Sequence, residues 1–199
     1  MYFYLKIKLY KRLIVLTLQI YTCQMKTHFL PSLILTFQLL FISCTMSQNP
    51  PSTTNAIDLK KYAGKWYEIA SFPMSFQKDC FCVTAEYTLT DKGYVKVFNS
   101  CRKGSVNGKI KSITGKAFPV NGSNNVKLKV QFFWPFRADY WVIDIAEDYS
   151  WAAVSGASRK YLWILSRTPD MEKETWQYIT GRLVENGFDL SKLKMMVHK

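Results

Sequence analysis

Thiols and imidazoles are the side chains of this chain that could carry covalent chemistry, and there are few of them. The 199 residues include five cysteines and two histidines. His28 lies in the apolar front of the chain and His198 is next to the last residue, so the body offers no Ser-His-Asp or Cys-His arrangement and no zinc-ligand spacing. The sequence therefore favours a protein that is not an enzyme and needs no metal or cofactor. A free thiol acting as a nucleophile is the alternative.

The carboxylates and the excess of positive charge are the other features that could serve catalysis or binding. A carboxylate pair could be drawn among Glu68, Glu86, Asp139, Asp144 and Asp148, but surface and capping roles explain these residues better. The formal net charge of +13 suits anionic membrane surfaces or acidic ligands. Because the lysines are spread over strands and turns and no glycine-rich phosphate loop is present, nucleic acid is not the expected partner.

Three cysteines in the body of the chain predict one disulfide bond between neighbouring strands. Cys101 lies across the turn at 91–93 from Cys80 and Cys82. An undistorted hairpin about this turn places residues whose numbers sum to about 184 opposite each other, so Cys82 and Cys101 need a bulge to reach one face. We favour Cys82–Cys101, while Cys80–Cys101 stays open.

The front of the chain is expected to direct export. From Met25 the sequence has one positive charge, a ten-residue apolar run at 33–42, and then Ser43-Cys44, which is the pattern of a secretory signal. Residues 41–44 resemble a bacterial lipobox, with Phe41 where leucine is usual. We therefore expect 25–43 to be a lipoprotein signal peptide and Cys44 to carry the lipid, with a plain cleavable signal as the alternative.

Two further segments flank this signal. Residues 1–24 hold a second apolar run that is too short to span a bilayer alone, and we interpret them as an upstream extension with translation starting at Met25. A two-span hairpin is the competing interpretation. Residues 44–57, with Pro50-Pro51 and a Ser-Thr-Thr run, are expected to be a flexible tether that leads into a domain over 58–199.

Short strands separated by turn signals dominate the body of the chain, which is typical of a sandwich or an up-and-down barrel. A single helix follows over 168–186, with Thr168 as its cap, Pro169 in its first turn and Gly187 after its end. Its apolar stripe would pack outside the sheet, and a closing strand is expected at 192–197. The eight main strands are predicted at 66–72, 83–89, 94–100, 109–118, 125–133, 140–146, 151–156 and 161–166.

The first strand and the last are expected to be joined by an arginine on a tryptophan. From Trp66 the first strand alternates, with Trp66, Glu68, Ala70 and Phe72 on one face. Gly64 permits a tight bend before it. Arg167 closes the last strand-like run, and its guanidinium on the Trp66 face would contribute about 0.5–2 kcal/mol.

These motifs resemble those of the lipocalins. Residues 64–70 (Gly-Lys-Trp-Tyr-Glu-Ile-Ala), Asp148-Tyr149 and residues 164–169 (Ile-Leu-Ser-Arg-Thr-Pro) have the order and spacing of that family over roughly 58–197. They look most like the bacterial outer-membrane lipoprotein lipocalins, with apolipoprotein D as a more distant relative. The resemblance implies an all-β, eight-stranded antiparallel barrel with one C-terminal helix packed outside. It also implies a structural role for Gly64, Trp66, Asp148, Tyr149 and Arg167.

The same resemblance implies a lipid carrier without enzymatic activity. A barrel of this size has room for one small ligand, here a fatty acid or lysophospholipid, with Arg137 and Arg159 near its head group. We expect a lipid-anchored protein on the outer membrane that faces the periplasm, and the sequence leaves a homodimer open. A carrier of a tetrapyrrole or pigment and a cavity enzyme that uses a cysteine thiol are the alternatives. The residues expected to line the interior are Tyr87, Val97, Phe118, Leu128, Val130, Tyr140 and Trp163.

Overall fold

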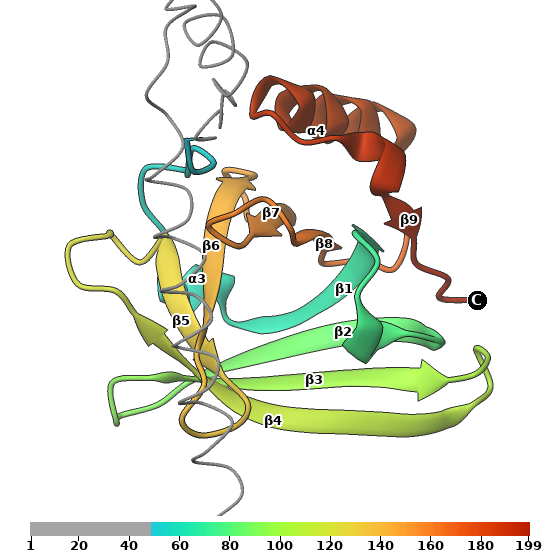
Figure 1. Ribbon diagram of the computed structural model, residues 1–199, viewed down its shortest axis with the longest axis horizontal. Helices are drawn as coiled ribbons and strands as arrows, with labels where there is room; N and C mark the ends of the chain where they lie inside the picture. The colour runs from blue at the N-terminus through green and yellow to red at the C-terminus, as the bar shows by residue number, and fades with distance from the viewer. Residues whose placement is uncertain (1–48) are drawn as a thin grey trace, which may run out of the picture. The chain divides into compact units, whose positions relative to one another are not determined.

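The computed structural model describes residues 49–199, which form a strand-rich domain (Figure 1). Alternating side chains and polar turns divide this part of the chain into nine strands, one longer helix and three short helical turns. The strands are β1 (Gly64–Ser71), β2 (Cys80–Leu89), β3 (Val95–Lys103), β4 (Lys109–Pro119), β5 (Lys127–Gln131), β6 (Ala138–Ile145), β7 (Trp151–Ser155), β8 (Leu162–Ser166) and β9 (Lys194–Met195). The helical elements are α3 (Leu59–Tyr62), η2 (Ser75–Gln77), α4 (Lys173–Glu185) and η3 (Leu190–Lys192).

The strands form one antiparallel sheet that closes on itself. Each strand from β2 to β8 pairs with the next one in the chain, β8 pairs with β1, and β1 pairs in turn with β2. The short β9 adds to the other half of β1. The predicted eight-stranded up-and-down barrel is therefore confirmed, and the closing strand expected at 192–197 is present as β9.

The C-terminal helix packs outside the barrel, as expected, but it begins later than predicted. Figure 1 shows α4 lying beyond β7 and β8, on one side of the sheet. Its buried Ile179 and Leu183 join an outer cluster that includes Ile143 and Ile164. Thr168 does not cap the helix, because its hydroxyl donates to the Asp170 carbonyl in the preceding turn, and α4 starts at Lys173 instead.

A bulge in β1 changes the predicted alternation of its side chains. Glu68 pairs with Leu165 and Ala70 pairs with Ile164, so one residue of β1 is extra. Leu165 belongs to the core inside the barrel and Ile164 to the outer cluster. Trp66 and Glu68 therefore share the inward face, whereas Ala70 and Phe72, which were predicted to lie on that same face, pack outside under α4.

A second bulge, in β2, decides the disulfide bond. Thr84 pairs with Ser100, as the predicted hairpin register requires, but Phe81 pairs with Arg102, so the register shifts between them. Cys82 lies in this bulge with a φ of 52°. The disulfide joins Cys80 to Cys101, with the Cα atoms 5.5 Å apart. The preference for Cys82–Cys101 was wrong, because the bulge turns Cys82 away and leaves it as a free thiol.

The segment before the barrel is packed where a flexible tether was expected. Ile57 is buried in the interior core cluster, and its N–H donates to the Asn124 carbonyl over 3.0 Å. Further back, Ser52 and Asn186 exchange two hydrogen bonds. The extension at 1–24, the signal peptide at 25–43 and the lipidation site Cys44 lie outside the described residues. Among residues 49–199, no helix is long and apolar enough to cross a membrane.

Candidate functional site

The floor of the barrel is built around Trp66, whose side chain is completely buried. Its indole N–H donates to the Tyr62 carbonyl over 2.8 Å, which ties β1 to the turn of α3 in front of it. Gly64 lies between the two with a φ of +94°, and a Cβ there would lie 3.5 Å from the Arg167 guanidinium. That distance is an ordinary van der Waals contact, so it is the positive φ of the backbone that favours a glycine here.

Arg167 follows β8, covers the outside of this floor and joins three other segments of the chain to it. Its guanidinium carbon lies 3.8 Å from the Trp66 ring centroid. Its nitrogen atoms donate to the carbonyls of Lys61, Tyr62, Lys65 and Tyr149 at 2.6–3.3 Å. The guanidinium thus satisfies carbonyl groups at the end of α3, at the start of β1 and in the β6–β7 turn.

Asp148 and Tyr149 shape the turn that Arg167 holds. The Asp148 carboxylate accepts the Ser150 N–H over 2.9 Å, and hydrogen bonds from Ser150 lower the pKa of Asp148. Tyr149 has a φ of 61°, and its hydroxyl accepts the Asp58 N–H over 2.9 Å. The β6–β7 turn is therefore fixed to the start of α3. The contacts of Asp148 and Tyr149 hold the fold together, which agrees with the structural role expected for them.

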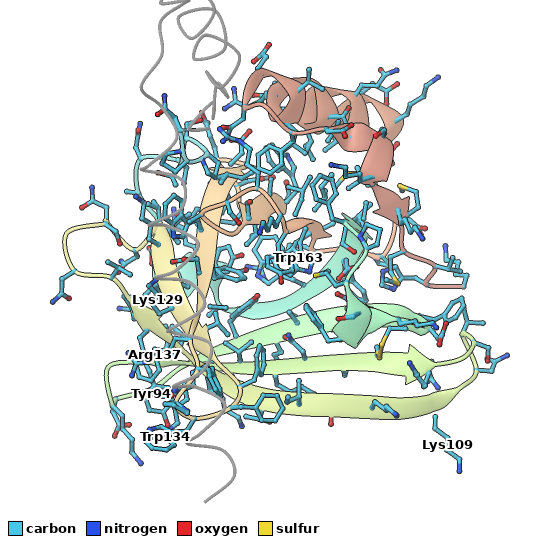
Figure 2. All side chains as sticks on the ribbon, viewed as in Figure 1. Tyr94, Lys109, Lys129, Trp134, Arg137 and Trp163 are labelled. Atoms are coloured by element: carbon cyan, nitrogen blue, oxygen red, sulfur yellow. A yellow bond between two sulfur atoms is a disulfide. The ribbon has the colours of Figure 1, made fainter. Side chains whose placement is uncertain are left out.

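The interior core contains most of the residues that were expected to line it. Tyr87, Val97, Leu128 and Val130 are buried there, and Tyr140 and Trp163 are half-buried against the same cluster. Figure 2 shows Trp163 near the centre of the domain.

Phe118 is the exception among the expected lining residues, and that assignment was wrong. Its neighbour Ala117 faces inward, so Phe118 faces outward, where its ring lies 5.9 Å from Tyr94. The interior at this level is already filled by Val95 and Val130, which flank Ala117 across the sheet.

Three tyrosines form a hydrogen-bonded chain inside the barrel. The Tyr140 hydroxyl lies 2.6 Å from that of Tyr62 and 2.8 Å from that of Tyr87. Burial raises the pKa of Tyr87 to about 12 and raises the pKa values of Tyr62 and Tyr140 well above their usual value, so all three are neutral. Because two hydrogen bonds use only two of the three hydroxyl hydrogens, this chain keeps one donor in reserve.

Polar groups also occur higher in the interior, and the sequence interpretation missed them. Glu68 faces inward and is only 3% exposed. Its Oε2 accepts from the Gln77 side chain over 2.5 Å. Burial raises the pKa of Glu68, and side-chain hydrogen bonds from Ser71 and Gln77 oppose that rise. The carboxamide oxygen of Asn99 is buried and has no hydrogen-bond partner within residues 49–199. The interior is therefore less purely apolar than expected.

The inner surface becomes exposed towards one end of the barrel. Along β4 the inward positions Ala117 and Gly115 are buried, but Ile113 is 36% exposed and Lys111 and Lys109 are open to solvent. The β3–β4 turn lies at this open end, and the β1–β2 connection is next to it, because the Gly104 N–H donates to the Asp79 carbonyl. β5 ends at Gln131 opposite Lys116, so the β5–β6 connection lies apart from Lys109, as Figure 2 shows for Trp134. α3 and Arg167 close the barrel beneath Trp66.

The two arginines expected near a ligand head group do not face the interior. Arg137 lies over Phe118 on the outer face, 4.2 Å from the ring centroid, and Figure 2 shows it beside Tyr94 and far from Trp163. Arg159 donates to the carbonyls of Asn186 and Asn49, which hold it against the helix and the N-terminal segment. The cations on the inward face of β4 near the opening are Lys109 and Lys111 instead.

The free thiol and the interior are separate sites. Cys82 lines a groove of about 360 Å³ on the outside of the sheet, together with Tyr67, Thr84, Arg102 and His198. Within residues 49–199 no cluster of three or more His, Cys, Asp or Glu side chains could hold a metal ion. A thiol enzyme working inside the barrel would therefore lack Cys82 as its nucleophile.

Known proteins resemble this chain in sequence and in fold. Among curated proteins, the chain is 42% identical to temperature-induced lipocalin-1 of Arabidopsis thaliana over 145 residues, covering 69% of this chain and 77% of the relative. It is 39% identical to the outer membrane lipoprotein Blc of Escherichia coli (strain K12) over 155 residues, covering 77% and 87%. It is 36% identical to apolipoprotein D of Bos taurus over 154 residues, covering 73% and 78%.

Solved structures and the family model agree with these relatives. Insecticyanin from the tobacco hornworm Manduca sexta matches with a TM-score of 0.60 at 22% identity, covering 75% of this chain and 84% of that one, a likeness that concerns the fold alone. The model of the lipocalin-like domain matches residues 57–198, which include the closed barrel, the Trp66–Arg167 contact and the helix described above. The chain belongs to the lipocalin family.

Proposed function

We propose that this lipocalin is a non-enzymatic carrier of single-chain lipids, with fatty acids or lysophospholipids as ligands. The observation that carries the proposal is a closed barrel whose inner face is apolar near the floor and reaches solvent at one end. An acyl chain placed among Tyr87, Val97 and Leu128 leaves water at a gain of about 25 cal/mol per Å². An anionic head group at the opening meets Lys109 and Lys111.

Exposed aromatic side chains of the β5–β6 connection support exchange of lipid with a membrane. Phe133, Trp134 and Phe136 of the β5–β6 connection are 69%, 86% and 77% exposed. Phe76 of the β1–β2 connection and Tyr161 of the β7–β8 connection are also exposed. Arg137 and Lys129 lie next to the β5–β6 connection and suit an anionic surface. We propose that this aromatic lip, defined as Phe133, Trp134 and Phe136, touches the bilayer during transfer.

Replacing Trp134 by serine should weaken binding to anionic vesicles by about tenfold or more, because an interfacial tryptophan contributes roughly 1.5–3 kcal/mol of apolar burial. The measurement is sedimentation with vesicles of mixed phosphatidylglycerol and phosphatidylcholine. The control is Tyr178→Ser, since Tyr178 is 57% exposed but lies on α4. Equal vesicle binding by wild type and Trp134→Ser would show that the lip does not touch the membrane.

We also propose that the protein is anchored through Cys44 to the outer membrane and faces the periplasm. The lipobox-like residues 41–44 and the relationship to the outer membrane lipoproteins Blc support this location. The plant relative lacks that designation in its name, so the proposal depends on the residues at the front of this chain. A thioether-linked lipid on Cys44 would then hold the barrel at the surface.

Mass spectrometry of the protein extracted from its own cells tests the ligand and the anchor together. We expect co-purifying fatty acid or lysophospholipid, and an N-terminal peptide that begins at an acylated Cys44. A tetrapyrrole or pigment in place of the lipid would contradict the ligand proposal. A mature protein that begins elsewhere, or that retains residues 2–24, would contradict the proposed anchor or start site.

A further inference from the structure

The groove on the outside of the sheet that contains Cys82 combines positive charge, hydroxyl groups and an apolar wall. It measures about 360 Å³, and its walls come from β1, β2, β3, β4 and the end of the chain at His198. The register of the sheet places Tyr67, Thr84 and Ser100 next to one another on this face, at the point where β1 and β2 stop pairing. Small-molecule sites in proteins typically measure about 300–1,000 Å³, so the groove is large enough for a small ligand.

Two cations line this groove without an acidic partner. Lys65 and Arg102 are both lining residues, no aspartate or glutamate is, and neither cation forms an ion pair within residues 49–199. Lys65 lies opposite Glu86 on the neighbouring strand, yet its ammonium group lies over the Tyr67 ring, 4.7 Å from the centroid. Arg102 donates to the Gly108 carbonyl over 3.3 Å, which positions the guanidinium and leaves its other N–H groups for a ligand. The groove therefore carries two uncompensated positive charges.

Hydroxyl groups and an apolar wall lie beside these cations. The Thr84 and Ser100 hydroxyls are 2.9 Å apart, so one hydrogen joins them and the hydrogen of the second hydroxyl can be donated to a ligand. The Tyr67 ring forms part of the wall and is held by the edge-on ring of His198, with the centroids 5.5 Å apart. Ile110 extends the apolar part and is 66% exposed. The groove thus suits a ligand with one anionic end and one apolar end.

We propose that this groove is a second binding site, outside the barrel, for a small phosphate monoester. Such a group carries a charge of about −1.5 to −2 at pH 7, which matches the two cations. Its oxygen atoms accept from Arg102, from Lys65 and from the free hydroxyl hydrogen, while its carbon part packs on Tyr67 and Ile110. A carboxylate would neutralise only one of the two cations. The site does not depend on the carrier function, because none of these side chains belongs to the interior core.

Phenyl phosphate is the probe for this site, and Cys82 reports where the probe binds. Because Cys82 lines the same groove, bound phenyl phosphate should protect its thiol from iodoacetamide, an uncharged reagent, and peptide mass spectrometry follows alkylation at Cys82 alone. Isothermal titration gives the affinity. We expect saturable protection, a Kd about tenfold higher in Arg102→Gln, and a smaller increase in Lys65→Gln, whose side chain is the more exposed of the two. Benzoate should bind about tenfold more weakly than phenyl phosphate, and benzyl alcohol should give no protection.

A matched control separates binding in the groove from general attraction of anions. Lys96→Gln removes one positive charge from an exposed position on the outer face of β3, outside the groove, and should leave the affinity and the protection of Cys82 unchanged. All measurements are made at one ionic strength, set with sodium chloride, because screening weakens every exposed charge alike.

Two arms distinguish the sources of the phosphate monoester. Protection by phenyl phosphate supports a soluble ligand, whereas protection by vesicles with phosphatidic acid, and not by vesicles with phosphatidylglycerol, supports a lipid head group. Either result supports the proposal if Arg102→Gln weakens it. Absence of protection in both arms, or protection that Arg102→Gln and Lys65→Gln leave unchanged, would overturn the inference. Palmitate binding should be the same in wild type and all three variants, so failure of the groove site leaves the carrier function standing.

Discussion

Replacing Arg167 by alanine should lower the free energy of unfolding by about 3 kcal/mol without changing which lipid is bound. The guanidinium donates to four backbone carbonyls and lies on the Trp66 ring. Hydrogen bonds from a charged group contribute about 1.5–3 kcal/mol each when buried, and a stacking contact about 0.5–2 kcal/mol. Because Arg167 is half-exposed, water replaces part of these interactions, so the expected loss is well below their sum.

Chemical denaturation followed by tryptophan fluorescence measures this loss. Arg137→Ala serves as the control, because its guanidinium also lies on an aromatic ring, 4.2 Å from the Phe118 centroid, but at an exposed position. We expect that variant to lose less than about 1 kcal/mol. The structural assignment of Arg167 would be wrong if its alanine variant kept the stability of wild type but lost affinity for monopalmitoylglycerol or palmitate.

The separation between floor and ligand site explains why affinity should survive. Arg167 lies on the outside of the floor, and the fully buried Trp66 stands between it and the interior. The groups proposed to contact the ligand, which include Tyr87, Val97 and Leu128, lie inside the barrel. Arg167 therefore stabilises the barrel that contains the site without touching what the site binds.

Much of this fold could be predicted because local signals and the closed sheet agree. Short alternating runs and turns such as the one at 91–93 indicated every strand of the barrel within a few residues. The Trp66–Arg167 pair was predictable from the motifs that contain it. The start of α4 was not, because Thr168 and Pro169 form a convincing helix start locally, yet the Thr168 hydroxyl bonds within a turn instead.

Alternation gives two faces of a strand but does not say which one lies inside. Phe118 was placed inside because it is large and aromatic, whereas the small Ala117 occupies the interior between Val95 and Val130. The aromatic ring is covered on the outside by Tyr94 and Arg137. In a narrow barrel the space left by neighbouring strands decides the face, and that information is not local.

Bulges are the second reason why parts of the site escaped prediction. The extra residue of β1 reverses the faces after Glu68, which could not be seen from a run that alternates regularly in sequence. A glutamate among inward positions was a signal for a polar interior, but a surface role was the more common explanation for such a residue. Only its burial on the inward face of β1 identifies it as part of the interior.

Replacing Cys101 by serine should lower the free energy of unfolding by about 3 kcal/mol. The Cys80–Cys101 bond closes a loop with a sequence separation of 21, and the chain-entropy model assigns a loop of that length roughly this value. Reducing the wild-type protein with dithiothreitol should produce a similar loss. Thermal and urea unfolding of the oxidised and reduced proteins measure both effects.

Comparing Cys82→Ser with Cys101→Ser distinguishes the two possible disulfide pairings, because each variant removes one sulfur atom from the same hairpin. Cys82 is free, and its thiol makes only a long contact of 3.6 Å to the His198 carbonyl, so we expect a change within about 1 kcal/mol. Cys80→Ser is less informative alone, since Cys82 could then pair with Cys101 across the shifted register. If Cys82→Ser lost as much stability as Cys101→Ser, and peptide mapping found Cys80 reduced, the bond would join Cys82 and Cys101, and the β2 bulge would have to place Cys82 on the inner face.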